Sequence, residues 1–538
     1  MKRFFGLFSK ENSFRGASII LIITLALSNI LGLLRDRFLT KNIATHDLDV
    51  YYASFRVPDL IFNFLILGAI SSAFIPIFSE FIAKKKEKEG FRVTNDLLNI
   101  GLIFMILAAA VFYLIMPQMM PLIVPKFDQE RLDQAIKFSR LMMITPIFFS
   151  ISYILGGVLN SYKRFLSYSL APLVYNLSII FGAAVLAPKY GMISVIYCVI
   201  AGSFFHLLVQ LPAAIKLGFR YQFILDFKEK TFRRIVALMV PRTIGMGANQ
   251  LLLIVYTAIA SSLAVGSISA FSLSNNMQTM PTVVFGTSFA TAVFPILTSK
   301  ISGNDREGFA FYLERSMRAI AFLLIPSSII MILLRAQIVR LILGSGKFNW
   351  DDTKMTAMTL GLFSISLLAQ GLIPLLAKAF YALKNTKTPM YISIVTVIIS
   401  VIFAYPLAKL LGVAGLALAF SIGSFTNAIA LFVCLNKIYP GGWRFGMIYS
   451  YVKITFISLA MGLFVWGTIH LMANVVDMTR FYGVLEQTIV ACLVGLISYL
   501  SLSYFFDCEE MKWALTRKIN RKIEKSLEEV ETAEYEKI

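Results

Sequence analysis

Residues 17–34 read ASIILIITLALSNILGLL, a run without a charged side chain that is long enough to cross a bilayer as a helix. Similar runs recur along the 538 residues, of which 58% are apolar and 15% are charged, against about 25% charged residues in soluble domains. Since each backbone amide in hydrocarbon must be paired within its own span, such long runs indicate helices and exclude a barrel of short alternating strands. The sequence therefore predicts an all-α polytopic membrane protein and excludes an ordinary soluble enzyme.

About fourteen segments are long and apolar enough to be transmembrane helices. They are approximately 17–34, 50–82, 93–124, 134–160, 166–187, 190–216, 231–263, 267–299, 316–336, 355–380, 389–411, 413–436, 446–472 and 483–506.

The basic residues lie mainly in alternate loops, and this fixes the expected orientation. With the N-terminus inside, most of the 50 Lys and Arg residues fall on one side, which the positive-inside rule assigns to the cytoplasm. We therefore expect both termini in the cytoplasm, and the net charge of +20 indicates topology rather than a nucleic-acid partner. The charged tail, 507–538, is either a solvated helix or an amphipathic segment lying on anionic lipid.

A weak internal repeat relates two parts of the chain. Residues 73–79 (AFIPIFS) near the end of the second span resemble residues 292–298 (AVFPILT) near the end of the eighth, an offset of 292 − 73 = 219. The loop 159–164 is echoed by 382–387 at a similar offset. Because six helices separate the copies, an even number, both copies keep the same orientation.

The repeat predicts two parallel six-helix lobes followed by two extra helices. The predicted parts are an N-terminal lobe (1–216), a cytoplasmic linker (217–230), a C-terminal lobe (231–440), two accessory helices (441–506) and the charged tail (507–538). The accessory pair either forms a groove for a lipid tail or only packs against the second lobe.

Prolines inside the paired helices predict a central cavity. A proline within a span frees a backbone carbonyl and bends the helix, so four such residues are candidate hinges of helices that line a space between the lobes. These residues are Pro58, Pro76, Pro281 and Pro295.

Charged residues within the spans cluster near the N-terminus. A charge at mid-bilayer costs about 2.5–3.5 kcal/mol on insertion scales, so Arg35, Asp36, Asp49 and Arg56 should face protein or water. Asp49 and Arg56 are seven residues apart and share a helix face, and arginine is well suited to bind phosphate with two donors. One hypothesis is an anion-binding stripe in the cavity. The alternative is that the four side chains only neutralise one another.

Nothing in the sequence indicates catalysis or a metal. The three histidines and four cysteines are scattered without ligand spacing, and no phosphate-binding glycine loop or nucleophile–base pair is present. We therefore expect a transporter without metal or cofactor. A membrane-embedded transferase would need an acidic cluster on an outer loop, where Asp351–Asp352 is the only pair and reads equally well as a helix cap.

Several stretches resemble the MurJ (MviN) family of lipid II flippases, within the multidrug/oligosaccharidyl-lipid/polysaccharide exporter superfamily. They are LGLLRD (31–36), DVYYASFRVPDL (49–60), AFIP (73–76) and AFYALKNTKTP (379–389). The resemblance covers nearly the whole chain. It implies export of a polyprenyl-diphosphate-linked glycopeptide, lipid II, from the inner to the outer leaflet of a bacterial plasma membrane by alternating access. Cell-wall synthases are its implied partners.

The chain departs from the pattern of this family at several cavity positions. Of the family's usual cavity arginines only Arg35 is clearly kept, and the resemblance places Asn29, Phe62 and Asn276 at the others. Either Arg35 and Arg56 with the two asparagines suffice to bind a pyrophosphate, or the substrate differs. The alternative functions are export of another polyprenyl-linked polysaccharide or of a drug-like cation, and a scaffold without transport.

Overall fold

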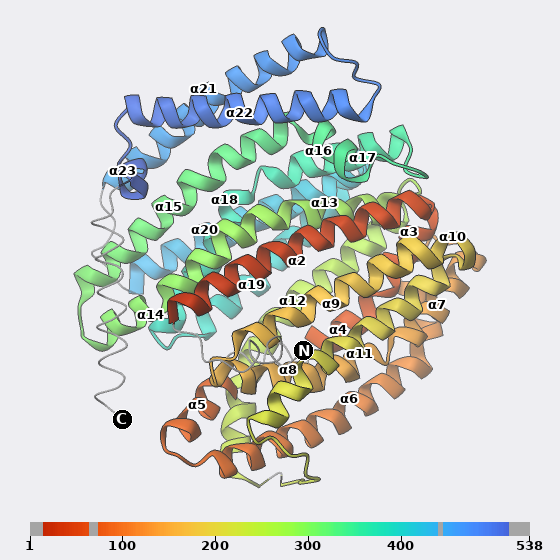
Figure 1. The fold of residues 1–538 in the computed structure, drawn as a ribbon, viewed down its shortest axis with the longest axis vertical. Helices are drawn as coiled ribbons and strands as arrows, with labels where there is room; N and C mark the ends of the chain where they lie inside the picture. The colour runs from red at the N-terminus through yellow and green to blue at the C-terminus, as the bar shows by residue number, and fades with distance from the viewer. Residues whose placement is uncertain (1–13, 64–73, 227, 439–444, 516–538) are drawn as a thin grey trace. The chain divides into compact units, whose positions relative to one another are not determined.

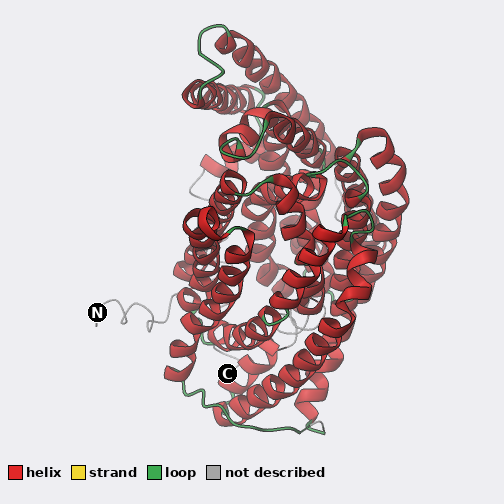
Figure 2. Ribbon diagram, turned by 90° about the vertical axis from the view of Figure 1, so that its right-hand side faces the viewer, coloured by secondary structure: helices red, strands yellow, loops and turns green. Residues whose placement is uncertain are grey.

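The computed structural model describes residues 14–63, 74–226, 228–438 and 445–515. Every regular element among these residues is a helix (Figure 2). The chain divides into two compact units, one of residues 1–269 with 345–348 and one of residues 270–344 with 349–538. The prediction of an all-α polytopic fold is confirmed.

The first unit contains, in chain order, α2 (Phe14–Asn42), α3 (Thr45–Ser54), α4 (Arg56–Phe62), α5 (Ile75–Ala83), α6 (Glu87–Ile123), α7 (Gln129–Met142), α8 (Thr145–Ser161), α9 (Phe165–Phe181), the π-helix η3 (Gly182–Leu186), α10 (Ala187–Tyr190), α11 (Met192–Lys216) and α12 (Lys230–Ser261). The second contains α13 (Ser267–Pro281), whose first turn belongs to the first unit, the π-helix η4 (Thr282–Thr287), α14 (Ser288–Ser302), α15 (Arg306–Leu333), α16 (Arg335–Leu343), α17 (Trp350–Ser364), α18 (Leu367–Ala382), α19 (Lys387–Leu411), α20 (Val413–Ile438), α21 (Phe445–Ala473), α22 (Phe481–Phe505) and α23 (Glu509–Leu515).

Ten helical segments within the described residues are long and apolar enough to cross a membrane, or eleven if α17 and α18, bent by 48°, form one span. These eleven correspond to eleven of the fourteen predicted spans. The other three fall on α2, on α3 to α5, and on α12, where part of the sequence or of its side chains lies outside the described residues.

Helices end at corresponding residues in the two copies of the repeat, and this supports the repeat inferred from the sequence. Five non-glycine residues at helix ends have φ between 54° and 58°, and in each case the next N–H bonds to the carbonyl five residues earlier, which is the Schellman pattern. Four of these five form matched pairs between the copies, and Gly191 and Gly412, which also have positive φ, form a third pair. The matched pairs are Lys85 with Asn304 (φ 55° and 55°), Lys163 with Lys384 (56° and 58°) and Gly191 with Gly412 (67° and 61°). Their offsets are 219, 221 and 221 residues.

The N-caps of α7 and α17 repeat in the same register. The Asp128 side chain accepts from the Arg131 N–H, and the Asn349 side chain accepts from the Asp352 N–H, 221 residues further on. Asp352 also accepts from the Asn349 N–H at 3.0 Å and completes a capping box. Asp352 is therefore part of a helix cap, which is one of the two interpretations given above for the acidic pair Asp351–Asp352.

The last two long helices pack against α15. α21 and α22 lie side by side (Figure 1), and Ile454, Ile457 and Met461 of α21 share an apolar cluster with Ala321 and Phe322 of α15. The chain continues into α23, whose acidic first turn is fixed to α15. Arg318 of α15 donates from Nε to Glu510 Oε1 at 2.7 Å and from Nη2 to Glu509 Oε2 at 2.8 Å. The first residues of the predicted tail are thus held to Arg318 by two ion pairs, one with the buried Glu510 and one with the exposed Glu509.

The predicted lobe boundaries stay a prediction. The compact units divide near residue 269, so that α12, the predicted seventh span, belongs to the first unit. A repeat defined by sequence offset and a unit defined by packing need not coincide, because a connecting helix can pack on the copy that precedes it.

Candidate functional site

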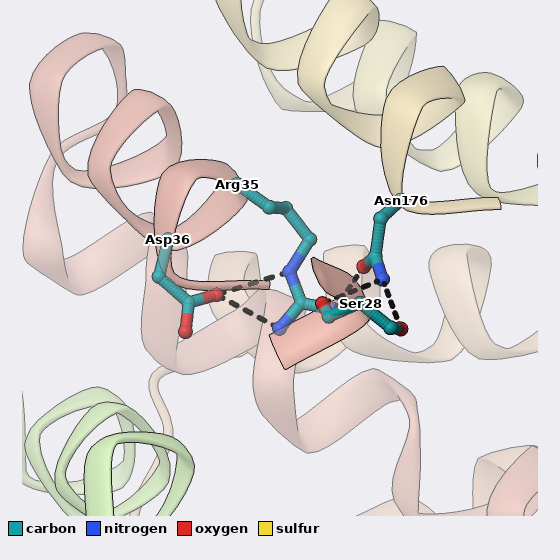
Figure 3. Close-up of polar contacts among 4 residues, drawn as sticks. All are labelled: Ser28, Arg35, Asp36 and Asn176. Carbon is teal, nitrogen blue, oxygen red and sulfur yellow. Dashed lines mark hydrogen bonds and ion pairs between the residues drawn. The ribbon is translucent and has the colours of Figure 1, made fainter. Parts of the chain in front are cut away.

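The Arg35 side chain extends from α2 toward α9 and bonds to residues of both helices (Figure 3). Its Nε and Nη2 donate to Asp36 Oδ1 at 3.0 and 2.9 Å, and its Nη1 donates to Asn176 Oδ1 at 3.3 Å. The Asn176 amide in turn donates to the carbonyl and hydroxyl oxygens of Ser28, at 3.5 and 3.4 Å. The Asp36 side chain is 1% exposed and that of Arg35 is 20% exposed. The guanidinium is therefore neutralised on one side and partly accessible on another.

The two asparagines of the predicted site lie on different units. Asn29 is half-buried on α2, seven residues before Asp36, and this spacing places both on one helix face. Asn276 is half-buried on α13, where its neighbour Asn275 accepts from Gln278 Nε2 at 3.0 Å. Whether either asparagine contacts a substrate stays a prediction.

Asp49 caps a helix far away in the sequence. It is 3% exposed, and its Oδ2 accepts from the Gly266 N–H at 2.6 Å. Its Oδ1 accepts from the N–H and the hydroxyl of Ser269, at 2.8 and 2.9 Å. These N–H groups belong to the start of α13, where the free amides and the helix dipole favour a negative charge. The carboxylate therefore stabilises the N-terminus of α13.

Arg56 stands where α3 breaks into α4, and it reaches α12. Its Nε donates to Thr257 Oγ1 at 2.7 Å, and the side chain is buried. Pro58 explains the break, because it lacks the N–H that would bond to the Ser54 carbonyl four residues earlier. That carbonyl instead accepts from the Ser139 hydroxyl of α7 at 3.0 Å. Of the four charged residues, only Arg35 and Asp36 are therefore seen to neutralise each other. Asp49 instead bonds to the start of α13, and Arg56 bonds to α12.

Of the other three candidate hinges, Pro281 lies next to a helix irregularity, whereas Pro76 and Pro295 lie within α-helices. Pro76 is in the first turn of α5, next to residues outside the described part of the chain. Pro281 ends α13 directly before the π-helix η4, and Pro295 is inside α14. At η4 the Ser288 hydroxyl donates to the Val283 carbonyl five residues back, at 3.1 Å. The local geometry is therefore irregular next to Pro281, and hinge motion at the prolines stays a prediction.

The helices of the predicted second and eighth spans differ from α6 and α19 in the side chains that they expose. Along α6 and α19, large apolar side chains such as Phe104, Leu107, Ile398 and Ile402 are 54% to 62% exposed, as expected of surfaces that face lipid. In the described parts of α3, α4 and α5, and of α13, η4 and α14, no large apolar side chain is exposed. The exposed residues on α14 are small or polar. These elements therefore do not present a lipid-facing surface.

Sequence reasoning missed several polar partners. Asn176 and Thr257 were not singled out, since a lone polar residue in an apolar run has no periodic signal. Lys378, near the end of the predicted tenth span, was not singled out either; it lies on α18, where its Nζ donates to Thr291 Oγ1 of α14 at 2.7 Å and lies 5.9 Å from the centre of the Phe294 ring. Its position near the end of a predicted span was the available signal.

Two solved structures with a similar fold are transporters. A lipid II flippase MurJ in an inward closed conformation matches 91% of this chain and 98% of its own, with a TM-score of 0.75 and 26% identity. An inward-facing multidrug resistance MATE family transporter of the MOP superfamily matches 78% of this chain and 98% of its own, with a TM-score of 0.65. At 12% identity the latter shows the fold alone. The chain therefore has the fold that these MurJ and MATE family structures share.

Sequence relatives narrow the class to one family. The lipid II flippase MurJ of Burkholderia cenocepacia is 29% identical over 478 residues, covering 85% of this chain and 91% of the relative. A probable lipid II flippase MurJ of Borreliella burgdorferi is 26% identical over 454 residues, covering 83% and 87%. The model of the lipid II flippase MurJ family matches residues 43–485, and the chain belongs to this family. Its members are transporters, so the predictions of family and of a non-enzymatic function are confirmed.

Proposed function

We propose that this chain, a lipid II flippase by family, carries its substrate from the cytoplasmic to the outer leaflet of a bacterial plasma membrane. Transport uses a water-filled path between two lobes that opens alternately to each side. The observation that carries this mechanism is the pair of elements related by the repeat, α3 to α5 and α13 to α14, whose described surfaces expose no large apolar side chain. A helix that neither faces lipid nor exposes apolar groups is suited to line such a path.

Arg35 is the proposed ligand of the pyrophosphate. Asp36 holds the guanidinium plane through Nε and Nη2, and this leaves Nη1 with an Asn176 bond that is long, at 3.3 Å, for a charged donor. A phosphate oxygen is a stronger acceptor than an amide oxygen, so it would displace Asn176. Asn29, on the same face of α2 as Asp36, would add a neutral donor.

The headgroup and the lipid tail take different routes in this proposal. The glycopeptide and pyrophosphate cross through the path, while the polyprenyl chain stays in the bilayer beside α21 and α22. The basic loops of the chain support cytoplasmic termini and a cytoplasmic entrance. Release at the outer leaflet delivers the substrate to cell-wall synthases, which are the proposed partners.

The test is depletion of the protein in cells, complementation with variants, and an assay of the leaflet in which lipid II resides. Arg35→Ala should be present in the membrane and fail to export lipid II. Arg480→Ala is the matched control, because that side chain is 80% exposed and paired with Asp477 at 3.1 Å. Normal export by folded Arg35→Ala protein would remove Arg35 from the mechanism.

A further inference from the structure

The segment between α11 and α12 is an extended strap, residues 217–226, fastened to the first turns of α6. Three buried polar side chains of α6 hold its backbone. Asn95 bonds to the Arg220 carbonyl and the Gln222 N–H, at 2.9 and 3.0 Å. Asn99 bonds to the carbonyls of Gln222 and Ile224, at 2.8 and 3.1 Å, and Asp96 accepts from the Asp226 N–H at 2.7 Å.

The hydrogen bonds follow the alternation of an extended chain. All of them use the backbone of even-numbered residues, so the backbone groups of the odd-numbered residues point away from α6. Tyr221, Phe223 and Leu225 are those odd residues, and no described residue bonds to their backbone groups. Their side chains are 61%, 71% and 40% exposed. A strap that is held along one edge thus displays three large apolar side chains on one of its faces.

The strap lies next to the N-terminal end of the lipid-facing surface of α6. Residues 93–100 of α6 are buried, and exposed apolar side chains begin at Ile103 and Phe104. Four residues of helix separate Asn99 from Ile103, a rise of about 6 Å. The exposed side chains of the strap therefore continue the lipid-facing surface toward the membrane–water interface.

The charge around the strap is positive. Residues 216–234 contain six basic and two acidic residues, and Arg220 and Lys228 flank the exposed apolar side chains. Cations beside aromatic and aliphatic groups are the composition of segments that lie in the headgroup region of anionic membranes. The unpaired backbone edge sets the depth, because such groups are tolerated among hydrated headgroups and not in hydrocarbon.

We propose that the strap is an interfacial anchor that binds the anionic lipid surface of the leaflet in which α6 begins. Tyr221, Phe223 and Leu225 insert at the boundary of headgroups and acyl chains, and Arg220 and Lys228 bind lipid phosphates. The bonds from Asn95, Asp96 and Asn99 hold the backbone of the strap at this depth and cover polar side chains that lipid would otherwise meet. The anchor fixes the height of the first unit in the bilayer.

The test measures the depth of single residues in the full-length protein. Spin labels are placed at Phe223→Cys, in a variant without its four native cysteines that still supports growth, and the protein is reconstituted into vesicles of phosphatidylethanolamine and phosphatidylglycerol. Accessibility to oxygen, which favours lipid, is compared with accessibility to a water-soluble nickel chelate. Gln222→Cys is the matched control on the opposite face of the strap, and Leu107→Cys marks the lipid surface of α6.

The label at position 223 should show an oxygen-to-nickel ratio several-fold above that at 222 and below that at 107. Replacing phosphatidylglycerol by phosphatidylcholine should lower the ratio at 223, and Arg220→Gln should lower it only in the anionic vesicles. Equal ratios at 222 and 223 would overturn the proposal. A label at 223 that is water-exposed in vesicles but protected in native membranes would overturn it as well, and would identify the strap as a docking strand for a protein.

Discussion

Replacing Asp49 by alanine separates a structural from a substrate-binding role for this carboxylate. The buried side chain accepts three hydrogen bonds at 2.6 to 2.9 Å from Gly266 and Ser269. Asp49→Ala leaves two backbone N–H groups without their acceptor, and an unsatisfied buried donor costs about 1–3 kcal/mol. Removal of a buried charge offsets part of this loss. We expect a net destabilisation of about 3 kcal/mol, with Asp49→Asn in between, because one oxygen remains.

The assay is thermal unfolding of purified protein in detergent, together with lipid II binding by the protein that stays folded. Asp47→Ala is the control on the same helix, since Asp47 is 36% exposed and pairs with His46 at 3.1 Å. Its loss should cost less than about 1 kcal/mol, as for other exposed pairs. The folded Asp49→Ala protein should still bind lipid II. Unchanged thermal stability with abolished binding would refute the capping role and make Asp49 a substrate ligand.

Three further predictions concern transport. Arg35→Lys should restore only part of the export lost in Arg35→Ala, because an ammonium cannot keep the paired bonds to Asp36 and also hold a donor in the place of Nη1, and full activity would contradict a need for the guanidinium. A disulfide between cysteines at Ser79 and Thr298, near the C-terminal ends of α5 and α14 that are proposed to face the cytoplasm, should stop transport, and transport that continues after quantitative crosslinking would rule out rocking of the lobes. Leu463→Ser and Leu496→Ser, on exposed faces of α21 and α22, should slow long-tailed substrate more than a short-tailed analogue. Equal effects would leave these helices a packing role only.

The choice of exposed leucines follows from a packing detail that the sequence does not reveal. Gly462 and Gly495 have no side chain and could therefore leave space for a groove. A Cβ added at Gly462 would lie 2.9 Å from Ile329 Cγ2, and one at Gly495 would lie 2.9 Å from Val465 Cγ2. Both glycines therefore allow close helix packing, and larger residues there would disturb the fold before they blocked a lipid.

Apolar run length and loop charge were sufficient to predict the fold class and most spans, because the bilayer dictates both. The repeat was visible in a few residues, and the matched helix ends extend it. The site was harder to predict. Helix periodicity placed Asp49 and Arg56 on one face, but their partners Ser269 and Thr257 are 220 and 201 residues away. Local spacing has no information about such partners, so the cap on α13 and the bond to α12 were not foreseen.

The π-helix η4 determines which side of α14 is displayed. A π-turn is equivalent to one residue inserted into an α-helix, and each residue turns an α-helix by about 100°. Deleting one residue from Thr282–Thr287 would restore α-helical winding and rotate everything after it by about that angle. The Thr291 hydroxyl, which accepts a hydrogen bond from the Lys378 ammonium, would then point in another direction, although no side chain of α14 had changed. The orientation of α14 thus depends on the number of residues in a short apolar segment rather than on the identity of any of them.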